Sequence, residues 1–299
     1  MAATPSPSGG QSIKGFLAAC LAAGSFSSSI TAASYAYGSG TNPITVIAFR
    51  AVLGLLSTGL ICVVWRRRIS INPAIIRPLL LTTLGIMMVN YGYIWAVQLI
   101  PVSLATLVFY TFPFIVLFVN SFSARRSPTP GVLFAFALAF GGLALALGPA
   151  IGDLDWRGIA AGLVASVGGA LTMIYGAPAA RGSSILTLTF YSHLILAPIA
   201  VVVLFVLGGP VPPQETLGWI ALLISGGGYL CGLAFQFIAV RLIETSTAAM
   251  VFNIEPLFTI ILAALVLGEV LGIFQYVGGG LVICAIVVAT RYLTTSSTK

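Results

Sequence analysis

Three ionisable residues, Arg50, His193 and Glu255, lie within long apolar stretches of this sequence. A carboxyl removed from water can exchange protons near neutral pH or bind an amine, and this is the chemistry expected of Glu255. The guanidinium of Arg50 stays charged and can hold a carboxylate or a phosphate through two parallel hydrogen bonds. The imidazole of His193 titrates near neutral pH and can serve as a proton switch. Glu255 and His193 are therefore candidates for proton coupling, and Arg50 is a candidate for ligand binding.

A second group consists of polar and aromatic residues in the same apolar stretches. Such a mixture is typical of a pocket that stacks on the apolar body of a small molecule and hydrogen-bonds its polar end. Together with Arg50, the predicted substrate-binding residues are Asn90, Tyr91, Trp95, Tyr110, Gln236 and Asn253. Some of the aromatic residues can belong instead to the belt at a membrane interface, or to simple packing.

These residues can act together only if the surrounding chain positions them, and its composition indicates a membrane protein. Hydrophobic residues make up 59% of the chain and charged residues 6%, and the mean hydropathy is +1.11. A soluble domain carries about 25% charged residues. A bilayer core about 30 Å thick needs about 20 apolar residues per helix. The sequence therefore predicts an all-α integral membrane protein.

Charged residues and Pro and Gly clusters divide the chain into ten predicted transmembrane helices. They cover residues 16–38, 43–65, 77–99, 101–122, 130–149, 156–180, 184–208, 215–240, 245–268 and 271–292. Residues 1–14 are rich in Pro, Ser and Gly and are expected to form a disordered cytoplasmic tail. Residues 294–299 are expected to form a second cytoplasmic tail.

The sequence contains an internal repeat half its own length. Residues 96–113 and 239–256, which are 143 positions apart, are identical at nine of 18 aligned positions. We therefore expect a first five-helix repeat over residues 15–152 and a second over residues 153–293. Because five is an odd number, the second repeat must enter the membrane from the opposite face. The predicted architecture is two inverted-topology repeats.

The distribution of basic residues predicts the orientation of these helices. If the N-terminus is inside, eleven Lys and Arg residues fall on the cytoplasmic side and Arg157 alone falls outside. Cytoplasmic loops are enriched in Lys and Arg, so both termini are expected in the cytoplasm and the protein in the inner or plasma membrane of the cell. The net charge of +7 then reflects topology and requires no nucleic-acid partner.

A charge inside the bilayer costs at least about 2.5–3.5 kcal/mol, so each of the three ionisable residues is expected to face protein or a water-filled cavity. Structural roles are also open to them. Arg50 and Glu255 can pair with each other, and Arg50 can extend towards the outer membrane interface. A neutral His193 can hydrogen-bond a neighbouring helix. The sequence leaves these alternatives open.

Inverted repeats are a recurrent architecture of secondary transporters, in which the binding site lies near the membrane midplane. Pro113 and Pro256 occupy equivalent positions in the two repeats and each remove a backbone donor in mid-membrane. They are predicted hinges, with a static kink as the alternative. We therefore predict a secondary transporter that moves a small organic metabolite by alternating access. An uptake carrier of the same fold and a channel-like facilitator remain as alternatives.

The sequence also resembles the EamA-type branch of the drug/metabolite transporter superfamily. The resemblance rests on Ala248-Ala249, on the central Pro256 and on Leu267-Gly268-Glu269, and its duplication covers nearly the whole chain. It implies ten helices with cytoplasmic termini, a central cavity lined by helices 1–4 and 6–9, and export of small metabolites. The sequence does not determine whether the substrate is an amino acid, an aromatic metabolite or a drug-like compound. In the first repeat Arg126 stands where a Glu is expected. This departure favours a packing or capping role for Glu269.

Other classes of function lack support in the sequence. It contains no residues spaced to bind a metal, no nucleotide-binding loop and no catalytic constellation, so we expect no cofactor and no enzymatic activity. The expected partners are a small-molecule substrate, the lipid bilayer and, if Glu255 or His193 titrates during transport, protons. The sequence does not determine the oligomeric state.

Overall fold

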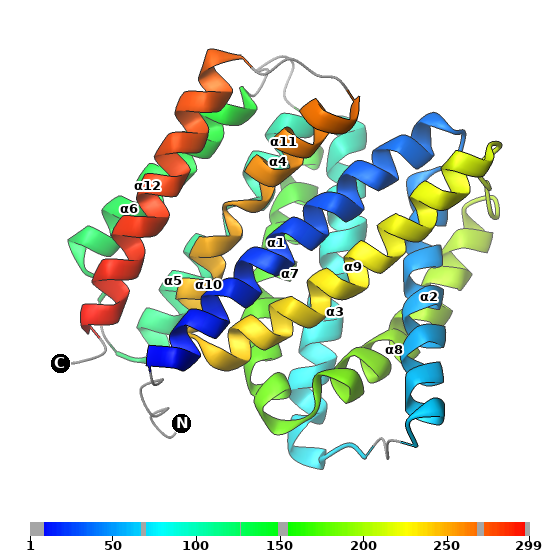
Figure 1. Cartoon of the computed structure of the whole chain (residues 1–299), viewed down its shortest axis with the longest axis horizontal. Helices are drawn as coiled ribbons and strands as arrows, with labels where there is room; N and C mark the ends of the chain where they lie inside the picture. Colours follow the sequence, from blue (N-terminus) through cyan, green and yellow to red (C-terminus); the bar gives the residue numbers. More distant parts are fainter. Residues whose placement is uncertain (1–8, 67–69, 126, 149–154, 268–271, 297–299) are drawn as a thin grey trace.

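The computed structural model of the 299-residue chain describes residues 9–66, 70–125, 127–148, 155–267 and 272–296. Helices account for all the regular secondary structure of these residues (Figure 1). The predicted all-α class is therefore confirmed. Arg126 and Glu269, which carry part of the family resemblance, lie outside the described residues.

The helices of the two repeats follow one another in the same order. Those of the first repeat are α1 (Gly9–Gly38), α2 (Pro43–Val64), α3 (Pro73–Leu99), α4 (Val102–Phe109), α5 (Phe112–Ser123) and α6 (Pro130–Leu147). Those of the second are α7 (Trp156–Gly182), α8 (Ile185–Val206), α9 (Thr216–Leu242), α10 (Thr245–Phe252), α11 (Glu255–Leu267) and α12 (Ile273–Ser296).

Local sequence determines where several helices begin. The side chain of Asn42 accepts a hydrogen bond from the backbone N–H of Thr45 at the start of α2, and Thr129 accepts one from Val132 at the start of α6. In both cases the next residue is proline. Proline suits the first turn because the N–H that it lacks would have no partner within the helix.

The two predicted proline hinges coincide with interruptions of helices. A short irregular segment separates α4 from α5 just before Pro113, and α10 from α11 just before Pro256. The side chain of Asn253 donates to the carbonyl oxygen of Met250 at 3.0 Å, which provides a partner for a carbonyl at the second interruption. Polar partners of this kind make a broken helix tolerable inside a bilayer. Whether the interruptions act as hinges stays a prediction.

Nine helices of the described residues are long and apolar enough to cross a membrane. In this count α4 and α5 form one span, and α10 with the first part of α11 forms another. Helix α12 has a shorter apolar stretch, Ile273–Ala289. The observed spans match the predicted helices closely in position. The total of ten and the cytoplasmic location of the termini stay predictions.

The two repeats interlock. Helix α1 of the first repeat packs along α9 of the second, and the equivalent helix α7 of the second repeat packs along α3 of the first (Figure 1). Helix α2 likewise packs on α8, and α6 on α12. The same pairs of helices are obtained when each helix is replaced by its equivalent in the other repeat. The core of the bundle is therefore an interface between the repeats.

Glycines allow these helices to approach closely. A Cβ atom on Gly85 of α3 would lie 2.5 Å from the carbonyl oxygen of Gly168 in α7, and one on Gly228 of α9 would lie 2.9 Å from that of Ser25 in α1. Backbone atoms cannot move away as a flexible side chain can. Gly168 and Gly228 are therefore positions of close helix packing.

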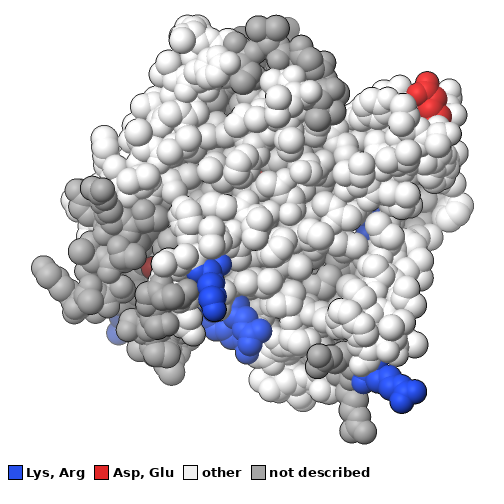
Figure 2. Space-filling view, viewed as in Figure 1, with Lys and Arg blue, Asp and Glu red and all other residues white. Residues whose placement is uncertain are grey.

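The start of α1 and the end of α12 lie at the same end of the bundle, at the lower left of Figure 1. In the same view, most of the visible Lys and Arg side chains gather towards this end, and an acidic side chain lies at the opposite end (Figure 2). We refer to the end that carries the termini as the basic end. The charge separation follows the pattern from which the orientation was predicted.

Candidate functional site

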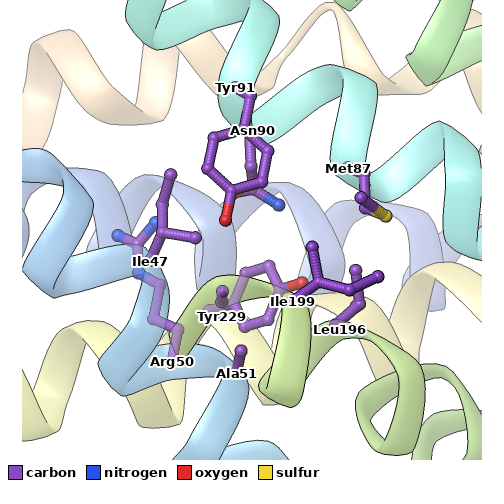
Figure 3. A pocket seen from close by; sticks show the side chains of 10 residues that line it. Ile47, Arg50, Ala51, Met87, Asn90, Tyr91, Leu196, Ile199 and Tyr229 are labelled. Carbon is purple, nitrogen blue, oxygen red and sulfur yellow. The ribbon is translucent and has the colours of Figure 1, made fainter. Parts of the chain in front are cut away.

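A pocket lies between the two repeats, among α2 and α3 of the first and α8 and α9 of the second (Figure 3). Its lining residues are Ile47, Arg50, Ala51, Met87, Asn90, Tyr91, Leu196, Ile199, Ala200 and Tyr229. The structure therefore brings together three of the predicted binding residues, Arg50, Asn90 and Tyr91. The cavity itself is small, about 10 Å³, which is room for about one water molecule, so a larger ligand requires the surrounding helices to move apart.

Arg50 is held by groups from two other helices. Its Nε and Nη2 atoms donate to the hydroxyl of Ser225 in α9 at 3.0 and 2.7 Å, and Nη2 also donates to the carbonyl oxygen of Ser29 in α1 at 3.1 Å. The centre of the guanidinium lies 5.7 Å from the ring centroid of Tyr229, a cation–π distance. These contacts orient the guanidinium, but none of them neutralises its charge.

The position of Arg50 argues against the predicted alternative in which it reaches for the outer interface. Arg50 is seven residues from the start of α2, whereas its partners Ser29 and Ser225 are nine residues from the end of α1 and from the start of α9. These three helix termini meet at one end of the bundle, where Gln214 donates to the carbonyl of Ser39. At 1.5 Å per residue the partners lie about 14 Å deep. The side chain points towards the membrane centre.

The alternative pairing of Arg50 with Glu255 does not form. Among the described residues the only ion pair joins Arg157 and Asp155 at the protein surface, at 2.7 Å. Glu255 interacts instead with the hydroxyl of Tyr110. The physical reason is geometric: Glu255 begins α11 beside the broken helices, whereas Arg50 faces α1 and α9.

The aromatic side of the pocket is formed by α3 and α9. The amide of Asn90 donates to the carbonyl oxygen of Ile86 at 2.9 Å, and Figure 3 shows Asn90 and Tyr91 reaching towards Tyr229 across the pocket. The hydroxyl of Tyr91 is buried and has no hydrogen-bond partner within the part of the chain that the structure describes. A buried polar atom without a partner is costly, so this hydroxyl is available to a ligand.

Glu255 belongs to a second polar cluster, at the interrupted helices. Besides the contact of its carboxyl with Tyr110, its backbone carbonyl accepts a hydrogen bond of 2.7 Å from the hydroxyl of Ser27 in α1. Tyr110 is itself packed against the rings of Phe109 and Phe112. Phe112 is the repeat equivalent of Glu255. The carboxyl therefore stands where the other half has an aromatic ring.

His193 is fully buried in α8. Its Nδ1 atom lies 2.7 Å from the carbonyl oxygen of Thr189, one turn earlier in the same helix, so the expected bond to a neighbouring helix is not the one observed. Its Nε2 atom has no partner among the described residues. The imidazole packs on Gly54 of α2, and its ring centroid lies 6.0 Å from that of Tyr229. His193 thus does not line the pocket itself but packs near Tyr229, which does.

The remaining predicted binding residues lie away from this pocket. Trp95 has 65% of its surface exposed and does not line the pocket. Tyr110 and Asn253 belong to the interrupted helices. Gln236 is buried in α9 two turns beyond Tyr229. Their assignment to substrate binding stays a prediction.

Sequence reasoning did not select Ser29, Ser225 or Tyr229 as binding residues. Ser225, Tyr229 and Gln236 lie on one face of α9, because they follow one another at intervals of four and seven residues. The spacing of Ser225 and Tyr229 was thus an available signal. The sequence contained no such signal for Ser29, because Ser29 binds Arg50 through its backbone carbonyl and not through its side chain.

The two ends of the bundle differ. At the basic end α5 packs against α10, and the amide of Asn120 donates to the hydroxyls of Thr245 and Ser246 at 2.5 and 2.9 Å. The repeat equivalents, α4 and α11, do not pack closely at the opposite end among the described residues. Thr245 is buried, whereas its equivalent Val102 is 60% exposed. The structure is therefore closed at the basic end.

Glu244 lies next to this closure, in the link between α9 and α10. Burial raises the pKa of the Glu244 carboxyl above its ordinary value, and a hydrogen bond with Ser246 opposes that change. The Glu244 side chain is nevertheless exposed, so this acid lies at the surface of the closed end.

Comparison with known proteins agrees with this architecture. The family model described as "EamA-like transporter family" matches the chain twice, over residues 13–148 and 156–291. The chain belongs to the EamA-like transporter family. The resemblance inferred from the motifs is thereby confirmed, and the family match covers two repeats. This EamA-like protein is a multi-pass membrane protein of a transporter family, in line with the expectation that it is not an enzyme.

One solved crystal structure superposes on the EamA-like chain with a TM-score of 0.77 at 18% sequence identity, covering 94% of this chain and 98% of the other. At this identity the likeness shows the fold alone. The comparison with curated proteins gives no match.

Proposed function

We propose that this protein is a secondary transporter that exports a small organic metabolite across the inner or plasma membrane by alternating access. The observation that carries the proposal is the pocket around Arg50, which both repeats line at the middle of the bundle. Inverted-repeat transporters bind their substrates at such an interface, near the midplane. In this pocket a substrate can form a hydrogen bond with the unpartnered hydroxyl of Tyr91 and an electrostatic interaction with Arg50.

The difference between the two ends supports alternating access. Because the repeats are equivalent, α4 and α11 at the opposite end can form the contacts that α5 and α10 make at the basic end, although they do not form them in this conformation. Rocking the halves can close one end as the other opens. The positive charges favour a cytoplasmic location for the basic end. With that orientation, this conformation is closed towards the cytoplasm.

The proposal is tested with the purified protein in proteoliposomes. Labelled amino acids, aromatic acids and aromatic amines are offered from outside, with and without the same unlabelled compound inside. A carrier gives saturable flux that the unlabelled compound accelerates by counterflow, whereas an open channel gives neither. Flux that does not saturate, or that equals flux in protein-free liposomes for every compound, would contradict the proposal.

Closure at the basic end gives a prediction about cross-linking. With Cys20, Cys62, Cys231 and Cys284 replaced by alanine, a short thiol cross-linker applied to the Asn120→Cys/Ser246→Cys variant is expected to hold that end shut. Counterflow then falls to the level of protein-free liposomes and returns after reduction. The single variant Asn120→Cys, treated identically, is the control. Normal counterflow in the cross-linked protein would show that this end need not open during transport.

A further inference from the structure

We infer that the transported metabolite is a monocarboxylate with an apolar or aromatic body, and that its carboxylate binds Arg50. This inference rests on the proposed transport function and narrows its substrate to one chemical class. It follows from three features of the pocket: its charge, the free donors of Arg50 and the apolar surface opposite them.

The charge of the pocket favours an anion. Arg50 is the only charged residue among those that line it. No carboxylate of the described residues pairs with Arg50, since Glu255 faces Tyr110 and Asp155 faces Arg157. An uncompensated charge at this depth is costly, and a ligand that carries one negative charge removes that cost. A phosphate would bring up to two negative charges, for which the lining provides no second cation.

The geometry of Arg50 leaves donors for such a ligand. The hydrogen bonds to Ser29 and Ser225 use Nε and Nη2. None of the hydrogen bonds observed in the described part of the chain uses Nη1, so this nitrogen has two N–H groups free. Because the other edge of the planar group is fixed by Ser225, the free edge is held in one orientation. A carboxylate oxygen there would gain a charge-assisted hydrogen bond.

The rest of the lining is chemically suited to contact an apolar body. Met87, Leu196 and Ile199 provide aliphatic surface, and the rings of Tyr91 and Tyr229 provide flat faces. The lining contains no carboxylate to receive an ammonium group. A zwitterionic amino acid would therefore leave its positive charge unmatched in this pocket, whereas the acid of the same body without the amine would not.

The test is a series of compounds that share a body and differ in charge. The phenyl set contains 3-phenylpropionate, phenylalanine, 3-phenylpropanamide, 3-phenylpropylamine and phenyl phosphate, and matching acid, amino acid, amide and amine sets use an indole and an unbranched six-carbon body. Binding to the detergent-solubilised full-length protein is measured by thermal stabilisation, and transport by counterflow. We expect the carboxylate to bind at least tenfold more tightly than the amide in at least one set, and the amine not to bind.

Variants then assign the preference to Arg50. Arg50→Gln is expected to weaken carboxylate binding about 100-fold and to leave amide binding unchanged, because it removes the charge and keeps a hydrogen-bonding side chain. Ser225→Ala is expected to weaken carboxylate binding about fivefold and to preserve the preference for the carboxylate, because Ser225 only positions Arg50. Arg157→Gln, a matched change outside the pocket, is the control.

Each result has a definite meaning. Binding or transport of amines or amides in preference to every carboxylate would overturn the inference and leave the transport function standing. The same holds for a preference for phenyl phosphate, or for a carboxylate preference that survives in Arg50→Gln. Failure of every carboxylate in all three sets to bind would also overturn it, whereas failure of counterflow with every compound offered would contradict the transport function itself.

Discussion

Replacing Glu255 with glutamine is expected to abolish the response of transport to a pH gradient while counterflow persists. Glu255 lies beside the interrupted helices, has no cationic partner among the described residues, and faces the hydroxyl of Tyr110. An ionised carboxyl there is costly when water is excluded and tolerable when water is admitted. Coupling follows if opening and closing of the bundle change its access to water, and the position of Glu255 at the start of α11 suits that role.

The measurement uses liposomes with an acidic lumen, into which a proton-coupled exporter accumulates labelled substrate as protons leave. For Glu255→Gln we expect the gradient-driven initial rate to fall at least about tenfold, a barrier change of about 1.4 kcal/mol or more. Exchange of substrate for substrate needs no net proton movement and is expected to continue. Glu215→Gln, which alters an exposed carboxyl before α9, is the matched control.

A companion variant separates the two candidate coupling groups. His193→Gln is expected to keep the response to the gradient, because the imidazole bonds its own helix and packs on Gly54, without reaching the lining of the pocket. Loss of the gradient response in His193→Gln, with a normal response in Glu255→Gln, would transfer the coupling role to His193. A gradient response unchanged in both variants would show that neither group couples protons to transport, whereas flux that no pH gradient affects in the unmodified protein would make it a facilitator or an exchanger.

The second large effect concerns the close approach of the interlocked helices. Gly228→Leu is expected to destabilise the protein by about 3 kcal/mol, at the upper end of what overpacking costs. A side chain at this position would meet the carbonyl oxygen of Ser25 at 2.9 Å and the backbone nitrogen of Ser29 at 3.1 Å. Moving α1 away from α9 would also shift Ser29 and Ser225 relative to each other, and both hold Arg50.

The adjacent glycine provides a control with the same chemistry. A Cβ atom on Gly227 would have no neighbour within 4 Å, so Gly227→Leu is expected to change the unfolding midpoint little. The midpoint is measured in detergent by the loss of monodisperse protein on heating. Equal midpoints for the two variants would mean that the α1–α9 contact can relax, and that the proximity of these backbones does not limit stability.

Much of the architecture could be predicted from the sequence because its causes are local or compositional. Membrane insertion follows from the length and apolarity of each stretch. The interruptions before Pro113 and Pro256 follow from a missing backbone donor, and the start of α2 follows from Asn42 and the proline after it. The repeat 143 residues apart implied two equivalent halves, and the family match later confirmed them.

The partners of the functional residues were decided only by the tertiary structure. In a bilayer, lipid and protein interior are equally apolar, so a helix carries no strong stripe to show which face meets another helix. Trp95 could therefore not be distinguished from the pocket residue Tyr91, although one lies on the outer surface and the other lines the cavity. Arg50 meets Ser225 and not Glu255 because α2 packs on α9 at that depth. That choice depends on how all the helices pack at once.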